Sequence, residues 1–182
     1  MKTLLRHFVL LASLAAAAFA QTPPPAADGT KVLFQEIFAT PDSLTTWRPS
    51  IGTLTQDGPP ATPGALKISA ETAAGSVFVG RKLDVTAFAG RAVVISARIK
   101  AAGLSTPPKP YNGIKIQLNI LKPDGKRDYP QATIAYSPEL PWTEVSFKRT
   151  IPAGSTELSL RVGLEKVTGS LWITDIKITA AP

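Results

Sequence analysis

From residue 31 onward, short runs of apolar residues recur at the spacing of β-strands. Val, Ile, Leu, Thr and Phe concentrate in these runs, and segments containing Pro or Gly separate them, such as Asp57-Gly58-Pro59-Pro60 and Pro152-Ala153-Gly154. No apolar stripe with the 3.6-residue period of a helix occurs there. The pattern predicts one all-β domain over 31–180, an antiparallel β-sandwich or jelly roll. The predicted strands are 32–38, 53–56, 65–70, 76–83, 92–100, 114–121, 131–136, 143–150, 157–164 and 170–179.

Three of these runs alternate between apolar and polar residues, which predicts one buried and one exposed face for each strand. The predicted buried sets are Val93, Ile95, Ala97 and Ile99; Ile114, Ile116, Leu118 and Ile120; and Leu158, Leu160, Val162 and Leu164. The polar sets include Arg98, Lys115, Gln117, Asn119, Arg161 and Glu165. If the three strands share one sheet, these polar side chains form one surface. Amide and guanidinium groups hydrogen-bond hydroxyls, so this surface is a candidate sugar site, and the alternative is a merely solvated sheet face.

Aromatic residues are the second element of a sugar site, because the flat side of a pyranose ring is apolar. Tyr111 follows the stiff loop Pro107-Pro108-Lys109-Pro110, so it is predicted to stand at the rim of a site or to pack over the sandwich edge. Tyr129 and Tyr136 are further candidates. The three Trp residues border apolar runs and are assigned to the core or its ends, Trp47 and Trp142 being more exposed than Trp172.

The N-terminal segment is typical of an export signal. Residues 1–20 contain a basic start, an apolar run from Phe8 to Phe19, and small residues at Ala18 and Ala20. We therefore expect a signal peptide over 1–20, a secreted protein in the periplasm or outside the cell, and no insertion in a membrane. Residues 21–30 are rich in Pro and predict a stiff linker.

Composition excludes several kinds of active site. The chain has no Cys, and its one His, His7, lies in the signal segment. The exported protein therefore lacks a catalytic serine–histidine pair, a cysteine nucleophile and a His/Cys zinc site. The full chain has a net charge of +7, but Lys and Arg are dispersed without a run of three. This distribution indicates a solvated basic surface and no nucleic-acid partner.

Carboxylates leave two further alternatives. Glu36 and Asp175 each interrupt an apolar run, so a structural Ca²⁺ with oxygen ligands is one interpretation, and pairing with Lys or Arg is the other. A glycosidase needs two carboxylates facing each other across a cleft. No spacing among Asp128, Glu144, Glu157 and Glu165 singles out such a pair, so the protein is predicted not to be an enzyme.

Several segments, in order, resemble the galactose-binding-like jelly-roll carbohydrate-binding modules found before catalytic domains in bacterial cellulases and other glycoside hydrolases. The similarity extends from about Val32 to Ile178. The segments are Leu33-Phe34-Gln35-Glu36-Ile37-Phe38, Lys82-Leu83-Asp84-Val85-Thr86-Ala87-Phe88-Ala89-Gly90-Arg91, Pro110-Tyr111-Asn112-Gly113-Ile114-Lys115, Asp128-Tyr129-Pro130-Gln131, Trp142-Thr143-Glu144-Val145-Ser146-Phe147, and Gly163-Leu164-Glu165 with Leu171-Trp172-Ile173-Thr174-Asp175-Ile176.

The resemblance implies a ligand groove on a concave sheet face and a structural Ca²⁺ that joins the first and last strands, with Glu36 and Asp175 at the matching positions. Trp172 would be structural, and Tyr111 stands where related modules often carry Trp. We therefore expect a free-standing, secreted, non-catalytic module that binds a polysaccharide such as a β-glucan. The predicted ligand-binding residues are Arg98, Tyr111, Lys115, Gln117, Asn119, Tyr129, Arg161 and Glu165. The alternative is a structural or adhesion sandwich of the cell envelope with a protein partner.

Overall fold

The computed structural model describes residues 31–62 and 64–181, so the predicted signal peptide and linker lie outside the described residues. The domain consists of strands and two short 3-10 helices. No helix in the described part of the chain is long and apolar enough to cross a membrane. The elements are β1 (Val32–Glu36), η1 (Pro41–Thr46), β2 (Thr53–Thr55), β3 (Ala65–Ala70), β4 (Ser76–Leu83), η2 (Val85–Ala87), β5 (Ala92–Ala102), β6 (Gly113–Leu121), β7 (Arg127–Asp128), β8 (Leu140–Thr150), β9 (Glu157–Glu165) and β10 (Gly169–Ala180).

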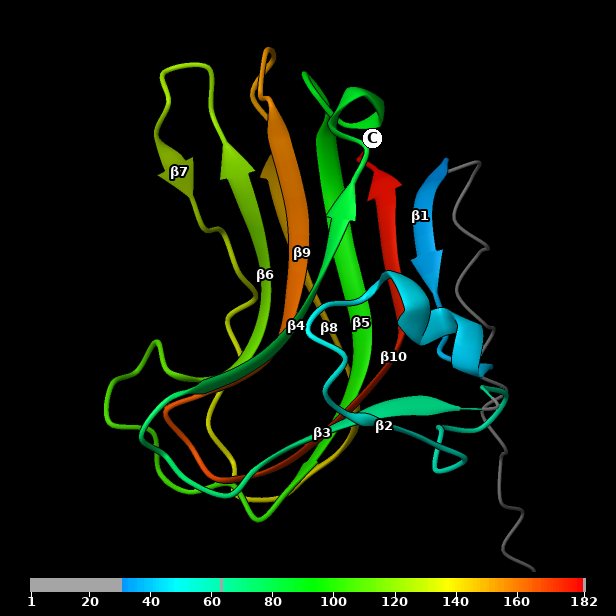
Figure 1. Ribbon diagram of the computed structural model, residues 1–182, viewed down its shortest axis with the longest axis vertical. Helices are drawn as coiled ribbons and strands as arrows, with labels where there is room; N and C mark the ends of the chain where they lie inside the picture. Colours follow the sequence, from blue (N-terminus) through cyan, green and yellow to red (C-terminus); the bar gives the residue numbers. More distant parts are fainter. Residues whose placement is uncertain (1–30, 63, 182) are drawn as a thin grey trace, which may run out of the picture.

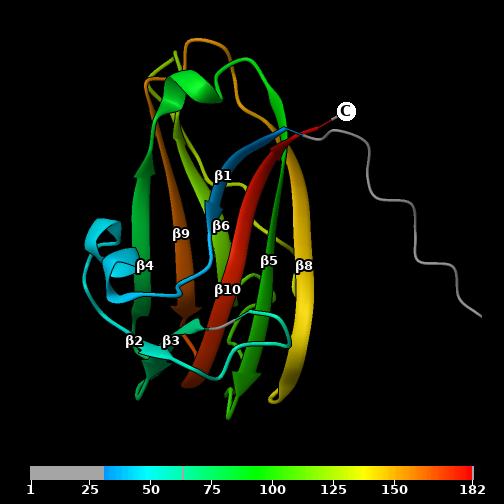
Figure 2. The ribbon, with the colours of Figure 1, turned by 90° about the vertical axis from the view of Figure 1, so that its right-hand side faces the viewer.

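The strands form two antiparallel sheets that pack face to face (Figures 1 and 2). The six-stranded sheet has the order β2-β3-β10-β5-β8, and β1 pairs with the second half of β10. The four-stranded sheet has the order β4-β9-β6-β7 and lies to the left in Figure 1. This architecture confirms the predicted antiparallel β-sandwich.

The core lies between the inner faces of the sheets. It contains the predicted apolar sets, because Val93, Ile95 and Ile99 of β5 are completely buried, as are Leu160 and Val162 of β9. In β6, Ile114 is only partly buried at the end of the strand. Strict alternation therefore identified the buried face of these strands correctly.

The predicted strand 131–136 is wrong. This segment is irregular, and its one bridge joins Gln131 to Gln117, whereas the strand beside β6 is the short β7. Ala132 is buried and Ile134 packs against the core, so the segment alternates as a strand would without forming a ladder. Its apolar side chains cover the core at the edge of the sandwich beside β6.

The edge of the sandwich between β1 and β4 is closed by η1 and the residue after it, Trp47. The Trp47 side chain is 1% exposed and its ring centroid lies 5.4 Å from that of Phe38. The prediction that Trp47 is more exposed than Trp172 is therefore wrong. Trp172 faces outward from β10, with the ammonium groups of Lys67 and Lys100 at 4.8 and 4.9 Å from its ring.

Candidate functional site

The outer face of the four-stranded sheet positions the candidate site. Strand register aligns side chains from β4, β9 and β6 in successive rows across this face, because residues opposite each other on antiparallel strands point to the same side. One row is Phe78, Gly163 and Lys115, the next is Gly80, Arg161 and Gln117, and the third is Lys82, Ser159 and Asn119.

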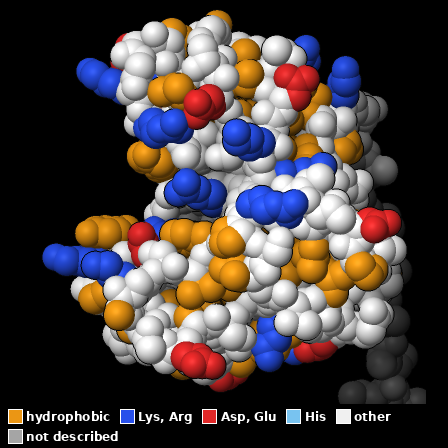
Figure 3. Space-filling view, viewed as in Figure 1, with side chains coloured by type: hydrophobic (Ala, Val, Ile, Leu, Met, Phe, Trp, Pro, Cys, Tyr) orange, Lys and Arg blue, Asp and Glu red, His pale blue; other side chains and the backbone are white. Residues whose placement is uncertain are grey.

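Two hollows that share Arg161 lie along these rows, and we call them together the groove. The larger hollow, of about 640 Å³, is lined by Lys82, Leu83, Asn119, Arg127, Tyr129, Thr156, Glu157, Leu158, Ser159 and Arg161. The smaller hollow, of about 330 Å³, is lined by Arg48, Pro49, Ser76, Phe78, Gly80 and Arg161. Figure 3 shows the molecule hollowed on the side of the four-stranded sheet, with Lys and Arg side chains gathered around this hollow. Arg161 therefore stands where the two hollows meet.

The floor of the larger hollow is held by a chain of polar contacts. Asn119, which is 8% exposed, accepts a hydrogen bond of 3.1 Å from Arg127 Nη1. The other guanidinium nitrogen of Arg127 donates to Glu157 Oε2 at 2.8 Å. Tyr129 remains 48% exposed beside them. The hollow thus combines a fixed amide with an accessible aromatic ring, which are the two elements a sugar requires.

Lys115 and Glu165 lie on the same sheet face but serve an internal network. Lys115 is 4% exposed, and its ammonium donates to Gln131 Oε1 at 2.8 Å and to the carbonyl oxygen of Tyr111. It also pairs with Glu165 at 3.1 Å, and Glu165 accepts from Asn112 Nδ2 at 2.7 Å. These contacts hold the loop before β6 against the sheet and occupy the ammonium of Lys115.

Of the predicted binding residues, Asn119, Tyr129 and Arg161 line the groove, and Gln117 lies beside Arg161 in its row. Arg98 does not share this surface. It belongs to β5 of the six-stranded sheet and faces Glu144 of β8. Alternation gives the exposed face of a strand but not the sheet it joins, so the assumption of one shared sheet was wrong for this residue.

Tyr111 and Tyr136 are exposed but lie outside the groove. Tyr111 is 62% exposed and lines a separate hollow of about 270 Å³ with Gln131 and Ile134. The hydroxyl of Tyr136 donates to the carbonyl oxygen of Leu104 at 3.1 Å and lines an apolar hollow at the end of the sandwich. The three tyrosines therefore do not form one aromatic platform.

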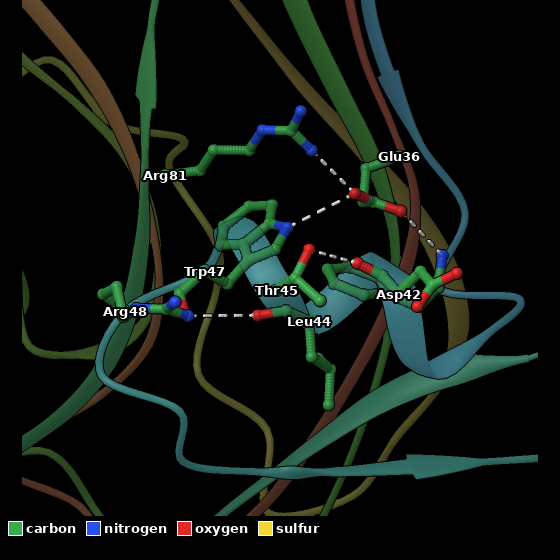
Figure 4. Close-up of polar contacts among 8 residues, drawn as sticks. Glu36, Asp42, Leu44, Thr45, Trp47, Arg48 and Arg81 are labelled. Carbon is green, nitrogen blue, oxygen red and sulfur yellow. Dashed lines mark hydrogen bonds and ion pairs between the residues drawn. The ribbon is translucent and has the colours of Figure 1, made fainter.

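The first predicted metal ligand, Glu36, is surrounded by hydrogen-bond donors (Figure 4). Its Oε2 accepts from Arg81 Nη1 at 2.9 Å and from the indole nitrogen of Trp47 at 3.3 Å. Its Oε1 accepts from the backbone nitrogen of Phe38 at 3.2 Å. A cation and two N–H groups thus already satisfy the carboxylate of Glu36, a residue that is 7% exposed.

The second predicted ligand, Asp175, faces the other side of the same strand pair. It pairs with Lys177 at 2.9 Å and accepts from Gln35 Nε2 at 3.3 Å, and these two residues are opposite each other on β10 and β1. Adjacent residues of a strand point to opposite faces, so Glu36 points away from the Gln35 side. The two carboxylates do not converge, and their donor contacts do not fit a Ca²⁺ ion held between them.

A bulge explains why a carboxylate interrupts the apolar run of β10. Asp175 has φ 48°, a conformation that Asp tolerates better than most residues, and the register of β10 against β5 shifts between Thr174 and Lys177. On its other side, β10 pairs with β3 before this point and with β1 after it. The bulge therefore marks the place where β10 changes partner.

No protein-family model matches this sequence, and no curated protein is similar to it in sequence. Solved structures do match. The CBM22-1 xylan-binding domain of Xyn10C from Paenibacillus barcinonensis has a TM-score of 0.62 at 17% identity, over 85% of this chain and 97% of that one. The C-terminal family 22 carbohydrate-binding module of Xyn10B from Clostridium thermocellum has a TM-score of 0.62 at 16% identity, over 86% and 98%. The fold is that of the β-sandwich carbohydrate-binding modules.

A family 16 carbohydrate-binding module extends this likeness, with a TM-score of 0.51 at 13% identity, over 70% of this chain and 84% of that one. The carbohydrate-binding-module fold agrees with the resemblance stated from the sequence. At these identities the likeness establishes the shape of the domain, and the role of each side chain is argued from the groove itself.

Within this carbohydrate-binding-module fold, the carboxylates considered for catalysis are separated or paired. Glu157 and Glu165 are at opposite ends of β9, about 27 Å apart at the rise of an extended strand. Glu144 lies on the other sheet, and Asp128 pairs with Arg149. Asp128 and Glu157 therefore each already have an arginine partner.

Several groove residues were missed from the sequence, namely Arg48, Phe78, Lys82, Arg127 and Ser159. Alternation along 76–83 would have placed Phe78 and Lys82 on the outer face, because Val77, Val79 and Leu83 face inward. Ser159 alternates with predicted core residues of β9 in the same way. Arg48 and Arg127 lie outside regular alternating runs, and only the folded chain brings them to the groove.

Proposed function

We propose that this chain is a secreted, non-catalytic carbohydrate-binding protein that binds polysaccharide in the groove of the four-stranded sheet. The observation that carries the proposal is the groove itself, in which Asn119, Ser159 and Arg161 from adjacent strands meet Tyr129 in one hollow. The likeness to xylan-binding modules supports it, and the export signal predicted over 1–20 supports secretion.

The chemistry of the groove suits an extended sugar chain. Amide, hydroxyl and guanidinium groups from three strands can bond the hydroxyls along its edge. Tyr129 in one hollow and Phe78 in the other offer rings to the apolar sides of sugar units. Because both hollows meet at Arg161, a chain crossing the sheet contacts both in succession.

Binding without hydrolysis is supported by the charges in the groove. The one carboxylate that lines the hollows is Glu157, and it pairs with Arg127 at 2.8 Å. A single carboxylate held in an ion pair does not supply the two carboxylates that glycoside hydrolysis uses. We propose a role in holding polysaccharide rather than cleaving it.

The test is titration calorimetry, in which soluble xylan or mixed-linkage β-glucan is added to the protein lacking residues 1–20. Tyr129→Ala should weaken binding by about fivefold, equivalent to about 1 kcal/mol. Tyr136→Ala is the matched control, because Tyr136 is 47% exposed and Tyr129 is 48% exposed, but only Tyr129 lines the groove.

Binding that is lost equally in both tyrosine variants would contradict the assignment of the groove. If the folded protein binds neither polysaccharide, the carbohydrate-binding function itself is contradicted. That result would favour a protein partner in the cell envelope. Release of reducing sugar ends from either polymer would contradict the non-catalytic role.

A further inference from the structure

The groove is rich in cations and poor in carboxylates. Its lining contains Arg48, Lys82, Arg127 and Arg161, against the single carboxylate of Glu157. Glu157 pairs with Arg127, so it leaves the other three cations without compensation. None of the ion pairs formed by the described residues includes Arg48, Lys82 or Arg161.

Strand register explains why these cations stay unpaired. The residues opposite Arg161 are Gly80 on β4 and Gln117 on β6, and the residue opposite Lys82 is Ser159. None of these neighbours carries a charge. Arg98 on the other sheet is different, because Glu144 stands directly opposite it. The outer face of the four-stranded sheet thus brings Arg161 and Lys82 together without a carboxylate directly opposite either of them.

The three cations are close enough to act on one bound chain. Arg161 and Lys82 are diagonal neighbours on adjacent strands, which places their Cα atoms about 7–8 Å apart. The backbone of Arg48 forms a β-bridge with Gly80 on the side of β4 that faces away from β9. The Cα atoms of Arg48 and Arg161 are therefore two strand spacings, or about 10 Å, apart. All three side chains are exposed, and each lines a hollow of the groove.

The guanidinium of Arg48 is held in position. Its Nη1 donates to the carbonyl oxygen of Trp47 at 2.9 Å and to Ser50 Oγ at 3.3 Å. Figure 4 shows it beside Leu44, whose carbonyl oxygen lies 3.5 Å from the same nitrogen. A guanidinium fixed in this way keeps a charge at the end of the groove with less loss of freedom on binding.

We propose that the groove selects a polysaccharide bearing carboxylate groups, that is, uronic acid units, with Arg161 as the central anion ligand and Lys82 and Arg48 on either side. This inference rests on the proposed function and adds the class of sugar. Guanidinium groups bind carboxylates through two parallel hydrogen bonds, and a hollow lined by one sign of charge concentrates the opposite charge.

The experiment compares three polymers by calorimetry at low and at moderate salt. They are glucuronoxylan, the same glucuronoxylan after its carboxyl groups have been reduced to alcohols, and dextran sulfate as a polyanion without uronic acid. Glucuronoxylan should bind at least about tenfold more tightly than its reduced form, and added salt should shrink this difference.

The variants are Arg161→Gln and Lys82→Gln, with Arg98→Gln as the control of equal charge change. Arg161 and Lys82 are exposed, so both variants should keep the thermal stability of the parent protein. Arg161→Gln should bring glucuronoxylan down to the affinity of the reduced polymer. Lys82→Gln should cause part of that loss, and Arg98→Gln should leave the preference unchanged.

Equal binding of glucuronoxylan and its reduced form would overturn this inference and leave the carbohydrate-binding function standing. Binding of neither polymer would overturn both. Dextran sulfate bound as tightly as glucuronoxylan, with equal losses in the Arg161 and Arg98 variants, would show general attraction to a basic protein and would also overturn it.

Discussion

Glu36 at the end of β1 and Arg81 of β4 form an ion pair of 2.9 Å that joins the two sheets at their common edge. The side chain of Glu36 is 8% exposed and that of Arg81 is 28% exposed, and Trp47 donates to the same carboxylate oxygen. This contact connects the first strand, η1 and the four-stranded sheet. It also accounts for a carboxylate in the apolar sequence of β1.

Replacement of Glu36 should therefore lower the stability of the sandwich. We expect Glu36→Gln to reduce the free energy of unfolding by about 1–3 kcal/mol, because Arg81 is left partly buried without its anion. Urea unfolding followed by tryptophan fluorescence measures this change. Asp57→Asn is the matched control, because its pair with Lys100 is more exposed and should contribute less than about 1 kcal/mol. Equal losses in the two variants would contradict the structural role of Glu36.

Calcium should have no effect on thermal stability. A ligand that binds only the folded state raises the melting temperature, and the carboxylates of Glu36 and Asp175 are instead turned to Arg81 and Lys177. We expect the same melting temperature in excess Ca²⁺ and in a chelator, measured by differential scanning calorimetry. A rise with Ca²⁺ that disappears in Glu36→Gln would restore the predicted calcium site.

Gly163 should resist substitution, because the backbone of β4 crosses it closely. Its φ is 155°, and an added Cβ would clash with the carbonyl oxygen of Val77 and lie 2.8 Å from the ring of Phe78. We expect Gly163→Ala to cost about 3 kcal/mol in unfolding free energy. Gly75→Ala is the control, since a Cβ there meets nothing within 4 Å. Unfolding curves that coincide for the two variants would contradict the close packing of Phe78 over β9.

Gly80 keeps the passage between the two hollows open. A Cβ at this position would lie 3.4 Å from Arg161 Cγ, so the strand tolerates a side chain while the groove would be narrowed by it. We expect Gly80→Leu to fold normally and to weaken polysaccharide binding by at least about tenfold, or about 1.4 kcal/mol. Affinity electrophoresis on xylan gels measures this loss, and Ser96→Leu on the outer face of the other sheet should bind as the parent does. Unchanged binding in Gly80→Leu would show that the sugar does not cross β4 at this point.

The sequence by itself determined the fold class, because alternation and turn residues act locally. Period-two runs such as 92–100 and 157–164 can bury one apolar face only as strands, and Pro and Gly between them end each strand. The same alternation placed Asn119 and Arg161 on the outer face of their sheet, where Arg161 is exposed and Asn119 is buried. Alternation predicted a strand wrongly at 131–136, where Ala132 and Ile134 contact the core from an irregular segment.

Only the tertiary structure decided which exposed residues meet. Strand pairing put Arg161 between Gly80 and Gln117 and placed Arg98 on the opposite sheet, because the partner of a strand depends on contacts between residues far apart in the chain. It also turned Glu36 toward Arg81 and Asp175 toward Lys177. The charge of the groove follows from the same pairing, since register determines which cations have a carboxylate opposite them and which remain free.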